Sequence, residues 1–158
     1  MLEWLVAEEI VRAQTTDCVL SAGGGHPPGP QYAKATGGTD PHLLGLATNG
    51  MIVVTKRTVF HSGQGGFELI CSACKTKFER PDNWGEAVGE WFEQSGPGEL
   101  ACPVCGVSQP IDRWQHDPPW GFGELGFEFW NWPPLNQAFV GELEKRLGSR
   151  IVYVSGKL

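Results

Sequence analysis

Two short stretches decide the fold of this chain: CSAC at residues 71–74 and CPVCG at residues 102–106. Each contains a Cys-x-x-Cys pair, and the 27 residues from 75 to 101 separate the two. Two such turns that face each other supply four thiolates at the corners of a tetrahedron, which is the geometry that Zn²⁺ prefers in closed sites. The spacing therefore predicts one metal ion bound by Cys71, Cys74, Cys102 and Cys105.

The second stretch resembles the knuckle of the zinc-ribbon family, Cys-Pro-x-Cys-Gly, in all its residues. This resemblance covers residues 71–106 only, and it implies a ribbon inserted in the chain and held by one zinc ion. The first stretch departs from the family pattern, because Lys75 stands where the knuckle glycine is usual and no proline follows Cys71. We therefore expect a less regular first turn with intact ligand spacing.

Other interpretations of the four cysteines stay open. Four thiolates also hold iron, so the ligand set does not separate zinc from iron. A thioredoxin-like redox motif needs one Cys-x-x-Cys at the start of a helix, and a second pair at knuckle spacing would then be a coincidence. Four cysteines leave no coordination position for water, so the metal is predicted to be structural and no catalytic residue is assigned. The fifth cysteine, Cys18, lies in an apolar run and is expected to be buried.

The segment between the pairs is longer than in compact metal ribbons, and it predicts a short amphipathic helix at about residues 83–95. Asn83 and Glu86 have the spacing of a capping box at its start. Helical spacing places large apolar side chains on one face of this helix: Trp84, Val88, Trp91 and Phe92.

The rest of the chain indicates an α+β fold: a small, mostly antiparallel sheet with N-terminal and C-terminal helices and the inserted zinc ribbon. Apolar periodicity predicts helices at about 2–14 and 135–147, and Gly148 is expected to end the second. Asn49-Gly50 predicts a hairpin turn. Strands are expected at 17–20, 51–55, 57–61, 67–71, 126–130 and 150–154. Those at 51–55, 57–61 and 67–71 are expected to form a meander. At 158 residues the chain is expected to be a single domain, 1–158, with its ribbon insertion at 71–106.

The composition of the chain disfavours several classes of protein. Eighteen acidic and 12 basic side chains give a net charge of −6, which opposes a broad nucleic-acid surface. Between Cys71 and Cys105 three basic and six acidic residues give −3, and four thiolates around one Zn²⁺ add −2. The sequence contains no run of 18 apolar residues and begins with an acidic segment, so neither a membrane span nor a signal peptide is predicted. An odd cysteine count opposes a secreted disulfide scaffold, and we expect a cytoplasmic protein.

Residues 111–132 are rich in aromatic side chains interleaved with glycine and proline, which is typical either of a recognition surface or of a core. We expect Trp120 and Trp132 to be the most exposed. A second candidate surface is the glycine- and proline-rich region 23–50, which contains His26 and His42 and whose order is left open. The full set of candidates for a binding surface is Trp114, Trp120, Phe122, Trp130, Trp132, His26 and His42.

Three hypotheses for the function follow. The first is a zinc-stabilised protein that binds another protein, as an inhibitor, an adaptor or a bacterial immunity-like protein. The second is a small enzyme whose histidines meet an aspartate or glutamate across loops, although no histidine pairing or nucleophile elbow appears in the sequence. The third is a zinc-ribbon protein that binds nucleic acid, which the acidic balance disfavours. The sequence leaves the partner, any reaction and the oligomeric state open.

Overall fold

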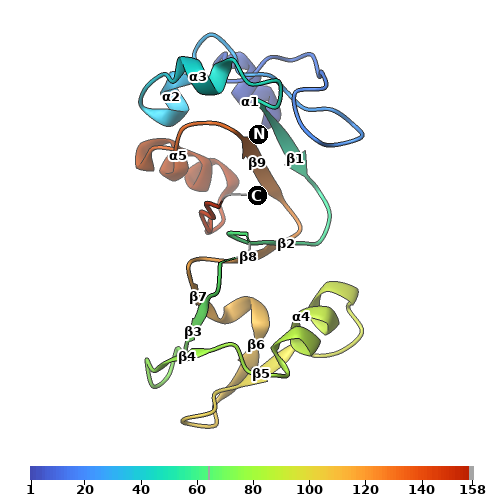
Figure 1. Ribbon diagram of the computed structural model, residues 1–158, viewed down its shortest axis with the longest axis vertical. Coiled ribbons are helices and arrows are strands. Elements are labelled where there is room, and N and C mark those ends of the chain that lie inside the picture. Colours follow the sequence, from blue (N-terminus) through green and yellow to red (C-terminus); the bar gives the residue numbers. More distant parts are fainter. Residues whose placement is uncertain (64, 157–158) are drawn as a thin grey trace. The chain divides into compact units, whose positions relative to one another are not determined.

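The computed structural model describes residues 1–63 and 65–156, and it confirms the α+β class (Figure 1). Its contacts divide the chain into two compact units. The first comprises residues 1–55 and 125–151, and the second comprises 56–124 with the described residues from 152 onward. Whether the chain folds as the single domain expected stays a prediction, because compactness does not show whether either unit folds without the other.

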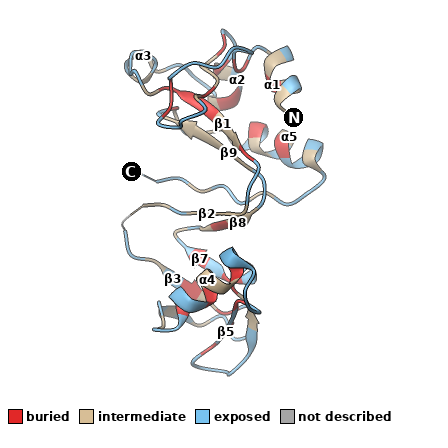
Figure 2. Cartoon of the chain, turned by 90° about the vertical axis from the view of Figure 1, so that its right-hand side faces the viewer, coloured by how far each residue is buried: buried red, intermediate tan, exposed pale blue. Residues whose placement is uncertain are grey.

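In the first unit, strands β1 (Gly50–Val54) and β9 (Gly126–Trp130) pair antiparallel, with Gly50 opposite Trp130. Helix α5 (Gln137–Leu147) lends Phe139 and Leu143 to the same core, and Figure 2 shows buried positions on β1 and α5 in red. Three shorter helices complete the unit: α1 (Leu2–Ala7), α2 (Ala33–Thr36) and α3 (Pro41–Leu44). The core consists of Leu5, Ile10, Val11, Tyr32, Ala35, Met51, Trp132, Phe139 and Leu143.

The first helix is shorter than the expected 2–14. It ends at Ala7, and Glu9 adopts a left-handed backbone conformation with φ of 55°. Ile10 and Val11 are buried in the core outside the helix, and Val11 forms an isolated bridge with Pro28. A Cβ at Gly29 would collide with the carbonyl of Glu9, so glycine permits this close crossing. Apolar residues at helical spacing thus serve the core without continuing the helix.

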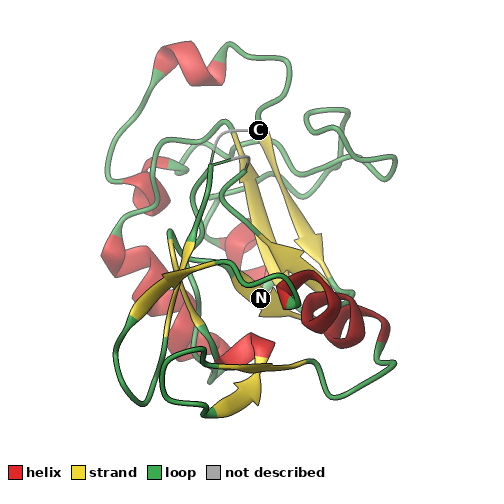
Figure 3. Cartoon of the chain, turned by 60° about the horizontal axis from the view of Figure 1, so that its bottom comes forward, coloured by secondary structure: helices red, strands yellow, loops and turns green. Residues whose placement is uncertain are grey.

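The second unit contains nine short elements among its described residues. Figure 3 distinguishes the helices, strands and loops of the chain by colour. Strands β3 (Glu68–Ile70), β4 (Lys77–Glu79) and β7 (Gln115–Asp117) form one sheet in the order β4-β3-β7. The remaining elements are the pair β2 (Thr58–Phe60) and β8 (Gly121–Gly123), the pair β5 (Glu99–Ala101) and β6 (Ser108–Pro110), helix α4 (Trp84–Glu93) and the 3-10 turn η1 (Ile111–Arg113).

Strand pairing corrects the expected meander and hairpin. The strands β1, β2 and β3 do not pair with one another; each pairs with a late strand, respectively β9, β8 and β7. Gly50 therefore begins a strand and makes no hairpin turn. A Cβ at position 50 would collide with the Cys18 side chain, so the glycine serves a close approach. Asn49 is buried, and its Nδ2 donates to the carbonyls of Leu43 and Asn131, each at 2.8 Å.

Of the remaining predictions about secondary structure and burial, some are confirmed and others are wrong. Helix α5 ends at Gly148 with φ of 64°, as predicted, and Cys18 is buried. The expected strands at 17–20 and 150–154 are wrong, because neither segment joins a ladder within the described residues, and Val152 and Tyr153 are exposed. Region 23–50 is not structureless, since it contains α2 and α3.

The insert helix is confirmed at Trp84–Glu93, with two of its details corrected. Asn83 makes no side-chain cap, so the capping box is wrong. Trp84, Ala87 and Trp91 are buried, whereas the Phe92 side chain is 51 % exposed. Neighbouring residues on a helix point about 100° apart, so Trp91 and Phe92 cannot both face the same core.

Candidate metal centre

Each Cys-x-x-Cys pair is the connection of a two-stranded antiparallel ladder. The first lies between β3 and β4, whose last pair is Ile70 with Lys77, and the second lies between β5 and β6, whose last pair is Ala101 with Ser108. The Ser72 hydroxyl donates to Oε1 of Gln109 at 2.7 Å, which links the first connection to strand β6. The fold thereby brings cysteines 28 or more positions apart in the sequence to one place.

The two knuckles share one hydrogen-bond pattern. The amide after the second cysteine donates to the carbonyl of the first cysteine, from Lys75 to Cys71 at 3.0 Å and from Gly106 to Cys102 at 2.9 Å. The first cysteine of each pair donates its own amide to a carbonyl five residues later, Cys71 at 3.1 Å and Cys102 at 2.9 Å. The expectation of a less regular first turn is therefore wrong.

Lys75 achieves this regularity in a backbone conformation that favours glycine. Its φ is 61°, close to the 75° of Gly106 at the equivalent position. For a residue with a Cβ this left-handed region costs roughly 1–2 kcal/mol. The first knuckle thus carries strain that the second avoids.

The four sulfur atoms lie within 4.8 Å of one another. The Sγ atoms of Cys71 and Cys105 are 3.7 Å apart, and those of Cys74 and Cys102 are 3.8 Å apart. A tetrahedron with metal–sulfur bonds of about 2.3 Å has edges of about 3.8 Å. The tetrad therefore has the dimensions and the soft donors of a closed metal site, and its arrangement is compatible with zinc-ribbon-like knuckles.

Burial divides the tetrad into two kinds of cysteine. Cys71 and Cys102 are buried, while Cys74 and Cys105 are exposed. The buried pair belongs to the core of the second unit, together with Leu69, Trp84, Ala87, Trp91, Leu100, Ile111 and Trp114. A metal ion held here would tie the two knuckles directly into an aromatic core.

The thiols perturb one another's pKa values. Hydrogen bonds from the side chain and backbone of Thr76, whose Oγ1 lies 3.4 Å from Sγ of Cys74, lower the pKa of Cys74 to about 6. Backbone hydrogen bonds, the largest from Cys105, also lower the pKa of Cys102. A backbone hydrogen bond from Val107 lowers the pKa of Cys105, but burial and the neighbouring thiols outweigh it and raise that pKa to about 11. Like charges cannot all gather here unaided, whereas a divalent cation offsets their repulsion.

Two of the three basic residues between the cysteine pairs have partners within the second unit. The Lys77 ammonium pairs with Asp117 at 2.6 Å and with Glu68 at 3.7 Å. These carboxylates, Asp117 most strongly, raise the pKa of Lys77. The Arg80 guanidinium lies over the Trp84 ring, 5.9 Å from its centroid.

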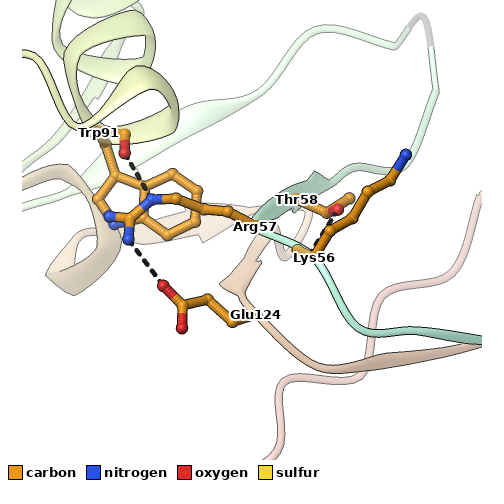
Figure 4. A network of polar contacts seen from close by, with 5 residues as sticks. All are labelled: Lys56, Arg57, Thr58, Trp91 and Glu124. Atoms are coloured by element: carbon orange, nitrogen blue, oxygen red, sulfur yellow. Dashed lines mark hydrogen bonds and ion pairs between the residues drawn. The ribbon is translucent and has the colours of Figure 1, made fainter.

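Where the chain enters and leaves the second unit, Arg57 joins three segments. Its Nε donates to the carbonyl of Trp91 at 2.6 Å, its guanidinium carbon lies 3.9 Å from the centroid of the Trp91 ring, and its Nη1 pairs with Glu124 at 3.0 Å (Figure 4). The pairing of Thr58 with Gly123 lies beside this contact. Sequence reasoning missed this role of Arg57, because its partners lie 34 and 67 positions away.

The aromatic candidates divide between core and surface. Trp114 is 4 % exposed and Trp132 is 9 % exposed, so the expected exposure of Trp132 is wrong. Trp132 packs edge-on against Tyr32 in the first core. The other three aromatic candidates, Trp120, Phe122 and Trp130, are half-buried. Their role in binding stays a prediction.

The structure places the four histidines in different surroundings. Within residues 1–63 and 65–156, no histidine ring shares a hydrogen bond with a carboxylate. His26 places Nδ1 2.9 Å from the Arg12 carbonyl and bridges Met51 through its backbone, while His42 is exposed on α3. His116 is buried, although Asp117 beside it is exposed and bound to Lys77.

His116 lies among the rings of Phe67, Trp84, Trp120 and Phe122. Its Nδ1 is 3.2 Å from the Trp114 carbonyl, and a carbonyl only accepts, so Nδ1 carries the proton. The other ring nitrogen, Nε2, is buried with no partner among the described residues. Burial lowers the pKa of His116 to about 4, against the opposing effect of the Trp114 hydrogen bond.

Comparisons with protein-family models, with curated proteins and with solved structures find no match for this chain. The zinc-ribbon resemblance is therefore carried by the cysteine tetrad and its knuckles alone. Among the described residues, no helix is both long enough and apolar enough to cross a membrane.

Proposed function

We propose that this protein is a zinc-stabilised protein-binding protein in which the metal is structural. The observation that carries the metal assignment is the closed tetrad, with all four sulfurs within 4.8 Å. Four protein ligands fill a tetrahedral shell, so no position remains for a substrate or an activated water. Zinc suits this site because it accepts four thiolates and has no redox chemistry of its own.

Binding to another protein, as an inhibitor, adaptor or immunity-like protein, is supported by the surface beside the metal centre. Val104 and Val107, in and just after the second knuckle, are 62 % and 42 % exposed. Exposed apolar side chains on a rigid turn are suited to contacts with a partner protein. The net charge of −6 favours a basic or neutral protein over nucleic acid as that partner.

The other two hypotheses have less support. An enzyme with a His/Asp site needs an imidazole within reach of a carboxylate, and the described residues contain no such hydrogen-bonded pair. Nucleic-acid binding needs a free basic surface, whereas Lys77 is occupied by two carboxylates. Retention on heparin at low salt, lost steeply as salt rises, would revive the nucleic-acid hypothesis.

Metal analysis of the purified protein tests the first part of the proposal. We expect about one equivalent of zinc and a colourless sample, and expect chelation to destabilise the protein. A coloured sample that contains iron contradicts the zinc assignment. Less than about half an equivalent of any metal contradicts the metal centre itself.

Affinity capture from the native cell under mild salt tests the second part. We expect a stoichiometric partner that is retained by the wild type and lost from Val104→Ser. The matched control is Leu20→Ser, because Leu20 in the first unit is 77 % exposed and lies far from the knuckles in sequence. Capture of nothing but the free protein, or equal loss of the partner from both variants, contradicts binding through the knuckle.

A further inference from the structure

All four sulfurs of the tetrad lie within 4.8 Å of one another, and two of their contacts join the two knuckles. The structure records Cys71 against Cys105 at 3.7 Å and Cys74 against Cys102 at 3.8 Å. Each of these pairs therefore takes one cysteine from the first Cys-x-x-Cys and one from the second. A disulfide bond needs sulfurs about 2.05 Å apart, so each pair would close by shifting its side chains less than about 2 Å.

The exposure of the four cysteines follows the same cross-knuckle pairing. In each cross-knuckle pair one cysteine is more exposed than the other: exposed Cys105 lies beside buried Cys71, and exposed Cys74 lies beside buried Cys102. An oxidant from solvent reaches the exposed member first, and a buried thiol then lies within 4 Å of the oxidised sulfur. Redox-sensitive sites have this arrangement, an accessible cysteine beside a resolving one.

We propose that the tetrad is a peroxide-sensitive site at which oxidation forms two cross-knuckle disulfides, Cys71–Cys105 and Cys74–Cys102, and so ends metal binding. The oxidant is a hydroperoxide, with hydrogen peroxide as the simplest member of the class. This inference rests on the proposed metal centre, because it supposes that the same four thiolates hold the ion in the reduced protein.

The chemistry balances for each pair. The exposed thiolate attacks one peroxide oxygen, the O–O bond breaks, and the products are a sulfenic acid and hydroxide, which takes up a proton to become water. The buried thiolate then attacks the sulfenic sulfur, an S–S bond forms, and hydroxide leaves and is protonated to water. Two thiols lose two electrons and one peroxide gains them, so the tetrad consumes two peroxides. A thiol reductant reverses the reaction by disulfide exchange.

The oxidised unit is expected to keep its chain path. Each new bond links the β3–β4 connection to the β5–β6 connection, as the metal does, so the same long loops stay closed. Disulfides within each Cys-x-x-Cys pair would leave the two knuckles unlinked. The pattern of disulfides therefore distinguishes a site that loses only its metal from one that also comes apart.

The test treats the zinc-loaded protein with hydrogen peroxide and maps its disulfides by mass spectrometry of peptides. Cys18→Ala removes the fifth thiol, which is buried in the first unit, and so keeps the thiol count unambiguous. We expect free thiols to fall from four to none, the mass to fall by four hydrogens, and zinc release to follow the same time course. A thiol reductant should restore both the thiols and metal binding.

Three outcomes would overturn the inference: disulfides within Cys71–Cys74 and Cys102–Cys105, overoxidation without disulfides, or zinc release with all four thiols still free. Trapping the sulfenic acid with a dimedone-type reagent adds an independent measurement, and the label should appear on Cys74 or Cys105 and not on the buried pair. Cys105→Ser should still form Cys74–Cys102, and formation of Cys71–Cys74 in that variant contradicts the pairing. Metal analysis of the reduced protein stands apart, since absence of metal there refutes the metal centre whatever the disulfide map shows.

Discussion

Exchanging the residue types at the two equivalent knuckle positions should change stability in opposite directions. Lys75 and Gly106 both follow the second cysteine of a pair, both have positive φ, and their amides donate to equivalent carbonyls. Lys75→Gly removes a Cβ from a conformation that glycine adopts freely. Gly106→Ala introduces one at the matching position. The two variants therefore test whether backbone strain at this turn limits the stability of the metal centre.

The magnitude follows from two opposing terms. A Cβ in the left-handed region costs roughly 1–2 kcal/mol, whereas glycine loses about 0.5–1 kcal/mol more backbone entropy on folding than alanine does. Lys75→Gly should therefore stabilise the second unit by about 0.5–1 kcal/mol, and Gly106→Ala should destabilise it by a similar amount. No atom lies within 4 Å of a Cβ built at Gly106, so the loss there contains no steric collision.

The assay is urea unfolding of the zinc-loaded protein, followed by transfer of the released zinc to a chromogenic indicator. This signal reports on the metal centre itself, which matters because a chain of two compact units need not unfold in one step. Lys75→Gln is the control for the lost charge, since it keeps the Cβ and should leave the midpoint close to that of the wild type. A lower midpoint for Lys75→Gly, or an unchanged one for Gly106→Ala, would refute the argument from strain.

Three further predictions concern the second unit. The His116 pKa is lowered to about 4 from the usual 6.5, so the unfolded chain binds the extra proton between these pH values. The contribution of His116 to the free energy of unfolding is therefore fully present above pH 6.5, and it falls by up to about 3 kcal/mol as the pH drops to 4. His116→Phe should flatten the dependence of this free energy on pH between 4 and 6.5. An unchanged dependence in that variant would contradict the role assigned to His116. Arg57→Ala should cost about 1–3 kcal/mol in urea unfolding, because it removes both contacts with Trp91, whereas Glu124→Gln, whose carboxylate is 68 % exposed, should cost under about 1 kcal/mol. Chelation should raise amide hydrogen exchange in the β5–β6 ladder more than in β1–β9, and equal increases in both ladders would contradict a metal that stabilises only its own unit.

Local patterns allowed the elements that depend on neighbouring residues to be predicted from the sequence. The four ligand positions, the helix around Trp84 and Trp91, and the end of α5 at Gly148 each follow from spacing or from one residue's backbone preference. The knuckle after Cys71 is a partial exception. Family resemblance predicted irregularity because lysine replaces glycine there, yet the same hydrogen bonds form and the backbone accepts the strain.

Some residues fit two different local structures equally well, and for these the sequence pattern predicted the wrong structure. Ile10 fits a helical stripe, but it is buried equally well in the bend that follows Glu9. Asn49-Gly50 has the composition of a tight turn, whereas its glycine makes room for Cys18 and its asparagine binds two distant carbonyls. Burial of this kind depends on tertiary neighbours, and no local window of sequence contains them.

The pairing order explains why the location of the metal centre was harder to predict than its ligands. The strands β1, β2 and β3 pair with β9, β8 and β7 in nested order, so the outgoing residues 50–70 meet the returning residues 115–130. Residues 71–114, enclosed by the β3–β7 pair, contain both knuckles and helix α4. Cys71 directly follows β3, and Cys102 and Cys105 precede β7, so a metal ion held by these cysteines would close most of the enclosed loop a second time. Cys71 and Cys102 are also buried in the core of this unit. Loop closure by a metal clip contributes more where the chain between its ligands is longer, so the 27 residues between the two pairs are where a bound ion would have its largest effect on stability.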